Sequence, residues 1–250
     1  MEFLIICPLA LLAGFIDAIA GGGGLISLPA FILAGVPVHN AIGTNKLAST
    51  LGTSIATIRY AMNGYMVKRF VVIGVACGLF GSYCGSNLAL VTNDFIFKVI
   101  MLAAIAPIAF FVLRTRDLDT FSHDPLPKRQ GLLVTAIIAL AIGIYDGFYG
   151  PGTGTFLMLL LTAVGHQTLT CAAGTTKAIN LSTNVAALAV FLVNGVVLLP
   201  LGLAAGAFNI VGNWLGARFF TKKGSSITRP VMIVVLVLFA IRLVYDLLGA

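Results

Sequence analysis

Gly21-Gly22-Gly23-Gly24 interrupts a long apolar stretch near the start of the chain, and Gly150-Pro151-Gly152-Thr153-Gly154 interrupts a second one in the same way. Each glycine costs a helix about 1 kcal/mol relative to alanine, and a proline costs about 3 kcal/mol. Regular helix is therefore expected to end at both places. The two breaks predict a chain built from two related halves, each opening with a broken helix.

Composition places these broken helices in a membrane. The chain has 250 residues, of which 59% are hydrophobic and 9% charged, and its mean hydropathy is +1.06. An average soluble domain has about 25% charged residues. Apolar runs approach the ~20 residues that cross a bilayer as a helix. We predict an all-α integral membrane protein, with no nucleic-acid partner, no cofactor and no metal ligand among its scattered cysteines.

The two halves align with each other beyond the breaks. Gly43-Thr44-Asn45-Lys46 corresponds to Gly174-Thr175-Thr176-Lys177, and Asp17 corresponds to Asp146. The alignment predicts a first repeat at 1–113, a cytoplasmic linker at 114–130 and a second repeat at 131–250. In each repeat a broken segment, 3–36 or 131–164, precedes three transmembrane helices, expected at 41–60, 70–91 and 95–113, and at 172–193, 199–217 and 229–248.

The orientation of the repeats follows from the basic residues, because cytoplasmic loops of membrane proteins are enriched in Lys and Arg. Three clusters hold most of them: Arg59 to Arg69, Arg114 to Arg129, and Arg218 to Arg229. If each broken segment crosses once, the third cluster lies opposite the first two. If it enters and returns, all three share one side, the halves are inverted, and both termini lie outside. We predict the second arrangement, whether the segments are re-entrant or fully spanning.

Non-helical backbone at membrane depth requires protein or a water-filled cavity around it. Facing breaks would bring free N–H groups and positive helix ends together, and both attract anions. This predicts that an anionic substrate contacts Gly22, Gly23, Gly24, Gly152, Thr153 and Gly154. A surface loop or close helix packing would also explain the glycines.

Polar stripes follow each break. Lys46 and Lys177 lie inside apolar spans, where a charge is costly and marks a functional candidate. Ser49 and Thr53 follow Lys46 at helical spacing, as Asn180 and Asn184 follow Lys177. These donors suit an oxyanion, and we extend the predicted substrate site to the neighbouring residues Thr44, Asn45, Thr175 and Thr176.

Asp17 and Asp146 are a symmetric pair of acids deep in apolar sequence. A carboxylate in the membrane pairs with a base, binds a cation or relays a proton. They are therefore candidates for coupling or for ion pairs. If they pair with the lysines, or if the lysines cap broken-helix carbonyls, the lysines are structural.

The glycine run continued through Leu25-Ile26-Ser27-Leu28-Pro29, together with Gly35-Val36-Pro37 and Gly43-Thr44-Asn45-Lys46, resembles the opening of sulfite exporter TauE/SafE family proteins. The second break with Gly174-Thr175-Thr176-Lys177 resembles the second half of that family. The resemblance implies a plasma-membrane permease for sulfite, thiosulfate or organosulfonates. Pro151 and Thr153 depart from the glycine run, so the two halves need not contact substrate equally.

These observations favour a secondary transporter that moves a small sulfur-containing anion by alternating access. The chain has no ATP-binding G-x-x-x-x-G-K-[ST] run, and no serine, histidine and acid lie together as in a hydrolase, so we expect no enzyme. An anion channel using the same lysine-lined site is the alternative. Homo-oligomer formation stays open.

Overall fold

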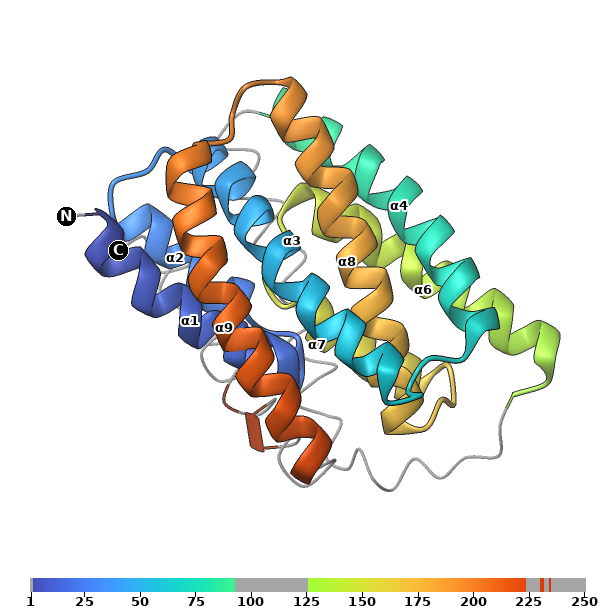
Figure 1. Cartoon of the computed structure of the whole chain (residues 1–250). Helices are drawn as coiled ribbons and strands as arrows, with labels where there is room; N and C mark the ends of the chain where they lie inside the picture. The colour runs from blue at the N-terminus through green and yellow to red at the C-terminus, as the bar shows by residue number, and fades with distance from the viewer. Residues whose placement is uncertain (1, 93–125, 224–229, 232–233, 235–250) are drawn as a thin grey trace.

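The computed structural model describes residues 2–92, 126–223, 230, 231 and 234. In this part of the chain every regular element is a helix, as predicted (Figure 1). The helices are α1 (Glu2–Ala20), α2 (Gly24–Leu33), α3 (Val38–Met62), α4 (Lys68–Val91), α6 (Lys128–Phe148), α7 (Thr153–Ala163), α8 (Leu169–Val193) and α9 (Leu199–Lys223). The spans expected at 95–113 and 229–248, and most of the linker, lie outside the described residues.

Both predicted breaks are present. Helix α1 ends before Gly21, whose φ of +76° is a left-handed conformation that glycine adopts without strain. Gly150 and Gly152 have φ of +97° and +84° between α6 and α7. At 1.5 Å per residue, α2 and α7 are about 15 Å long, half of the ~30 Å hydrocarbon core. Each broken segment thus pairs a helix long enough to span with one of half that length.

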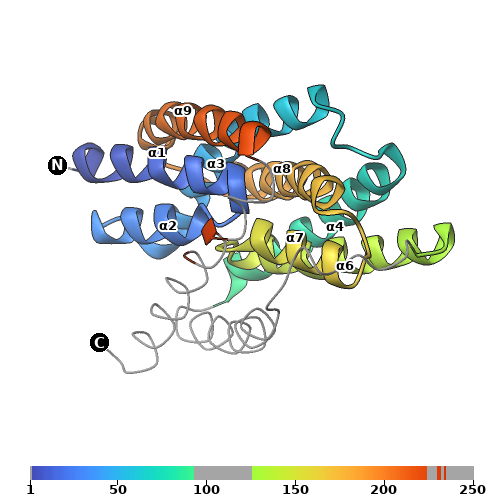
Figure 2. The ribbon, with the colours of Figure 1, turned by 90° about the horizontal axis from the view of Figure 1, so that it is seen from below.

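Each broken segment turns back on itself. Figure 2 shows α2 running back alongside α1, and the two helices pack together. The chain therefore reverses direction between α1 and α2, as the predicted arrangement requires. Which helix ends face which side of a bilayer stays a prediction.

Helices α4 and α9 pack on the opposite half. Helix α4 packs against α6, and α9 packs against α1. Gly81 lies against the carbonyl of Leu140, and Gly212 lies against the carbonyl of Leu11, so a Cβ at either glycine would meet backbone. These are equivalent contacts in the two halves, and they bring helix backbones close together.

Corresponding helices run in opposite directions. Along the chain, α3 runs down the view in Figure 1 and α8 runs up it; α4 runs up and α9 runs down. This agrees with inverted repeats, although the orientation of each half relative to a bilayer stays a prediction.

The basic clusters gather at one end of the bundle. The turn between α3 and α4 and the start of α6 lie toward the lower right in Figure 1, and the end of α9 lies at the bottom. These positions carry Arg59, Lys68, Arg129 and Arg218. The predicted topology places the three basic clusters on one side of the membrane, and it therefore requires these helix ends to lie together.

The outward faces are apolar. Large hydrophobic side chains such as Leu33, Val72, Phe80 and Val193 are 64–88% exposed. Helices α1, α4, α6 and α8 are long and apolar enough to cross a membrane. Helices α4 and α8 contain the predicted spans 70–91 and 172–193. Helices α3 and α9 contain the other two predicted spans in the described part. They are less apolar because they carry polar residues of the interior.

Candidate functional site

Two buried ion pairs join the halves crosswise. Lys46 of α3 pairs with Asp146 of α6 at 2.8 Å, and Lys177 of α8 pairs with Asp17 of α1 at 3.0 Å. Each lysine thus bonds to the acid of the other repeat. The structure contains the ion pairs that the sequence left as one alternative for these residues.

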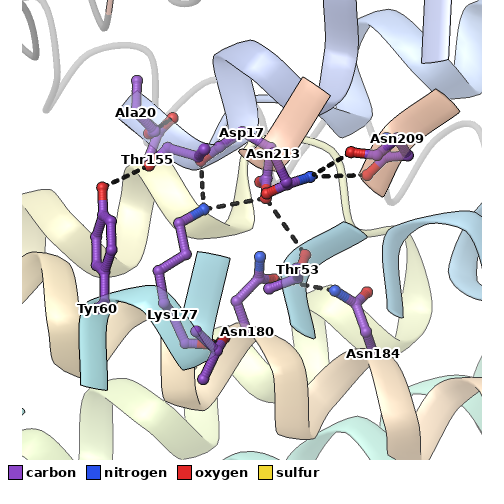
Figure 3. Close-up of polar contacts among 12 residues, drawn as sticks. Asp17, Ala20, Thr53, Tyr60, Thr155, Lys177, Asn180, Asn184, Asn209 and Asn213 are labelled. Carbon is purple, nitrogen blue, oxygen red and sulfur yellow. Dashed lines mark hydrogen bonds and ion pairs between the residues drawn. The ribbon is translucent and has the colours of Figure 1, made fainter. Parts of the chain in front are cut away.

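Lys177 closes the end of α1. Its Nζ also donates to the backbone carbonyl of Asp17, within the last turn of α1 (Figure 3). Tyr60 Oη donates to the carbonyl of Ala18 at 2.8 Å, and Thr155 Oγ1 donates to that of Ala20 at 2.7 Å. The last carbonyls of a helix have no partner within it and carry partial negative charge. Three other helices supply donors to this end, including a cation.

Lys46 has a different environment. Its Nζ donates to Asn184 Oδ1 at 3.1 Å. On its partner Asp146, Oδ1 accepts a hydrogen bond from Thr153 Oγ1 at 2.7 Å, whereas Oδ2 faces Lys46 without the angles of a hydrogen bond. Thr153 Oγ1 also lies 2.6 Å from the carbonyl of Gly150, so its single proton is shared between two acceptors, and Lys46 is the charged partner of Asp146.

A cavity of ≈ 20 Å³ lies between the breaks and the long central helices. This is room for about one water molecule. Both acids and Lys46 line it, with backbone from both breaks. The lining residues are Asp17, Gly21, Gly23, Gly24, Asn45, Lys46, Ser49, Thr53, Asp146, Gly150, Thr153, Asn180, Asn184 and Asn209.

Most predicted site residues meet at this cavity, from both halves. Asn45 is among them, and its buried Oδ1 has no hydrogen-bond partner among the described residues. Seven predicted residues are not part of the lining: Lys177, Thr44, Thr175, Thr176, Gly22, Gly152 and Gly154.

Some of those seven residues make other contacts. Thr44 Oγ1 accepts from the backbone of Leu198 at 3.0 Å. Gly154 packs against Gly21, so the two breaks touch through glycine backbone. Close packing, the alternative reading of the glycines, thus holds for part of each break.

Sequence reasoning missed Asn209, Gly21 and Gly150 in the lining. Asn209 of α9 donates from Nδ2 to the carbonyl of Ala10 at 3.0 Å, and Asn213 donates to Asn209 Oδ1 at 2.8 Å. Figure 3 shows both asparagines beside Asp17 and Thr53. Asn180 was predicted from its helical spacing after Lys177. Asn209 follows no such lysine, and the signal that could have found it is an asparagine within the apolar span 199–217.

The family of the chain is shown by comparison with known proteins. A family model described as sulfite exporter TauE/SafE matches residues 6–243. The chain belongs to this family. A probable membrane transporter protein, ORF9, from Sinorhizobium sp is 36% identical over 95% of the chain and 90% of its own length. One from Haemophilus influenzae is 34% identical over 94% and 91%.

A third TauE/SafE relative, YfcA of Escherichia coli K12, is also named a probable membrane transporter protein and is 31% identical over 95% of this chain and 87% of its own. No solved structure matches the chain. The expected membrane transporter family is confirmed. The central feature of this TauE/SafE chain is a charged, amide-rich cavity buried among apolar helices.

Proposed function

We propose that this protein is a secondary transporter of the plasma membrane that moves a small sulfur-containing anion, such as sulfite, thiosulfate or an organosulfonate. The observation that carries the proposal is Lys46, a cation 3% exposed that lines a cavity between the two halves. A buried ionisable group in a membrane protein that faces a cavity marks a substrate or ion pathway. The basic end of the bundle faces the cytoplasm, and both termini lie outside.

The other lining groups suit an oxyanion. Asn45, Ser49 and Asn184 carry amide or hydroxyl donors on helices that flank Lys46, and Gly23 and Gly24 bring backbone of the first break to the same place. Amide, hydroxyl and ammonium groups all donate hydrogen bonds to sulfonate oxygens. Lys177 belongs to the frame of this site, because its Nζ is used by Asp17.

The size of the cavity bears on mechanism. A space for about one water molecule is smaller than thiosulfate or a sulfonate. Substrate entry therefore requires the two sides of the cavity to separate. An enclosed site that must open favours alternating access over an anion channel, which needs a continuous pore. We propose no catalytic role for the site.

Thermal stability with a panel of anions tests the substrate class. Purified protein is melted with sulfite, thiosulfate, sulfoacetate, sulfate or chloride. A ligand at a hundredfold excess over its Kd stabilises the native state by about 2.7 kcal/mol. This corresponds to a rise in Tm of about 5–10 °C for a chain of this size.

Two lysine variants make the test specific. We expect Lys46→Gln to abolish the anion-dependent rise in Tm. Lys68→Gln, which changes an exposed lysine at the start of α4, should leave it intact. If no sulfur anion raises the Tm, or Lys46→Gln responds like the wild type, the proposed site is wrong. Saturable uptake of ³⁵S-thiosulfate into proteoliposomes then separates a transporter from a channel.

A further inference from the structure

The buried charges of the described residues cancel. Lys46 and Lys177 are 3% and 0% exposed, and Asp17 and Asp146 are 8% and 1% exposed. An anion that enters this neutral group alone leaves an uncompensated negative charge away from water, which is strongly unfavourable. A positive charge must therefore enter with the anion.

One of the two ion pairs can exchange its partner at the cavity. Lys177 lies outside the lining, and its Nζ is bound to both the carboxylate and the backbone carbonyl of Asp17. Lys46 lines the cavity, so an anion there can take the place of Asp146 beside Nζ. The carboxylate displaced in this way is Asp146.

We propose that Asp146 takes up one proton when the anion binds Lys46, so that the protein carries one H⁺ with each anion in the same direction. This inference rests on the proposed function. The proton binds Asp146 Oδ2, the oxygen that Lys46 leaves when it pairs with the anion, while Oδ1 keeps its contact with Thr153. The anion then pairs with Lys46, and the proton offsets one unit of its negative charge, so that a singly charged anion leaves the site neutral.

The groups around Asp146 allow this exchange. Lys46 faces it from α3, and the Asp17–Lys177 pair lies across the cavity from α1 and α8. On α6 itself, Tyr145 donates its hydroxyl to the carbonyl of Pro151. Among the described residues, α4 carries its charges at its exposed start and α7 has no titratable side chain. Lys46 is therefore the cation that the anion must share with Asp146.

A metal cation is a poorer companion for the anion. A metal cation in the cavity would lie beside the ammonium group of Lys46, which repels it. A proton needs no volume and neutralises the displaced carboxylate directly. The experiment separates the two ions.

The test uses full-length protein in proteoliposomes with a pH-sensitive dye inside, in sodium-free buffer, and with the membrane potential held at zero by potassium and valinomycin. Thiosulfate is the probe because it stays deprotonated near neutral pH and cannot carry the proton itself. We expect inward thiosulfate to acidify the lumen, with one H⁺ per ³⁵S-thiosulfate. A gradient of about one pH unit should sustain about tenfold accumulation of the anion, since both correspond to the same free energy.

Asp146→Asn removes the proton site while keeping an oxygen for Thr153. This variant should lose luminal acidification and pH-driven accumulation, yet still exchange labelled for unlabelled thiosulfate. Glu2→Gln, which changes an exposed carboxylate at the start of α1, is the matched control and should retain both.

The outcomes separate this inference from the proposed function. Thiosulfate uptake by the wild type without luminal acidification, or uptake that requires Na⁺, overturns proton coupling and leaves the transporter intact. Acidification that persists in Asp146→Asn overturns the choice of Asp146. If neither thiosulfate nor sulfoacetate is taken up, the proposed function fails and the coupling fails with it.

Discussion

Replacing Lys177 by methionine tests whether this lysine holds the fold. Methionine keeps most of the length and apolar volume of the side chain but leaves Asp17, 8% exposed, without its cation. Breaking one side of a buried ion pair costs about 3–5 kcal/mol. With a change in Tm of about 2–4 °C per kcal/mol for a chain of this size, Lys177→Met should melt roughly 6–20 °C below wild type.

The double variant Lys177→Met with Asp17→Asn identifies the cause. Uncharged replacements of a whole buried ion pair are often nearly neutral for stability. The double variant also loses the bond from Nζ to the carbonyl of Asp17, which is worth about 1 kcal/mol. We expect it to recover more than half of the Tm lost by Lys177→Met.

Fluorescence-detected size-exclusion chromatography after heating measures these values in mild detergent. Lys46→Met is the comparison, because Lys46 donates to Asn184 and to no helix-end carbonyl, whereas Lys177 also bonds the carbonyl of Asp17. Its Tm should fall less than that of Lys177→Met. If Lys177→Met melts like wild type, Lys177 is not a structural residue and a direct role in substrate binding is restored. If the double variant melts as low as the single one, the unpaired charge of Asp17 is not the cause of the loss.

Three further predictions concern the breaks, the cavity and the topology. Gly21→Ala should destabilise the protein by about 2–6 kcal/mol, because it combines left-handed φ with a clash against Gly154. Gly35→Ala has open space around its Cβ and should cost about 1 kcal/mol. Equal melting temperatures of the two variants would contradict the packing of the breaks. Asn45→Ala should lower the anion-dependent rise in Tm several-fold. Without anion, its free energy of unfolding should stay within about 1 kcal/mol of wild type, since its Oδ1 has no hydrogen-bond partner to lose among the described residues. In a variant without native cysteines, Met62→Cys and Val193→Cys should react with impermeant maleimide from opposite sides of sealed vesicles, and labelling from one side would refute the predicted topology.

The breaks and the side shared by the basic clusters were predictable because both depend on local chemistry. Four consecutive glycines stop a helix in any surroundings, and Arg59 or Arg218 at a helix end reports on the nearest aqueous side. The predicted end of the broken segment at 36 lies close to the end of α2 at Leu33, because Gly35 and Pro37 favour a turn there.

The site was predictable in its residue types but not in its asymmetry. Lys46 and Lys177 align in the repeat, so the sequence predicts the same role in substrate binding for both. Their difference is tertiary: Tyr60, Thr155 and Lys177 converge on the end of α1, whereas Lys46 meets Asn184 and the cavity. The partners of these bonds come from different helices, and no local pattern reports which helix end receives which donor.

Under the proposed alternating access, the packing of the helices divides the molecule into two units that would move against each other. Helix α9 packs closely on α1 and α3, and α4 packs closely on α6 and α8, so each compact unit contains one helix of the other repeat. Both ion pairs cross between these units. Because Lys177 has no other anion to bind and Lys46 can be offered a substrate, we expect the units to rock about the Lys177–Asp17 pair and to part at the Lys46–Asp146 pair. Opening of the cavity and exchange of the partner of Lys46 would then be one event, which is the condition for coupling the anion to the movement.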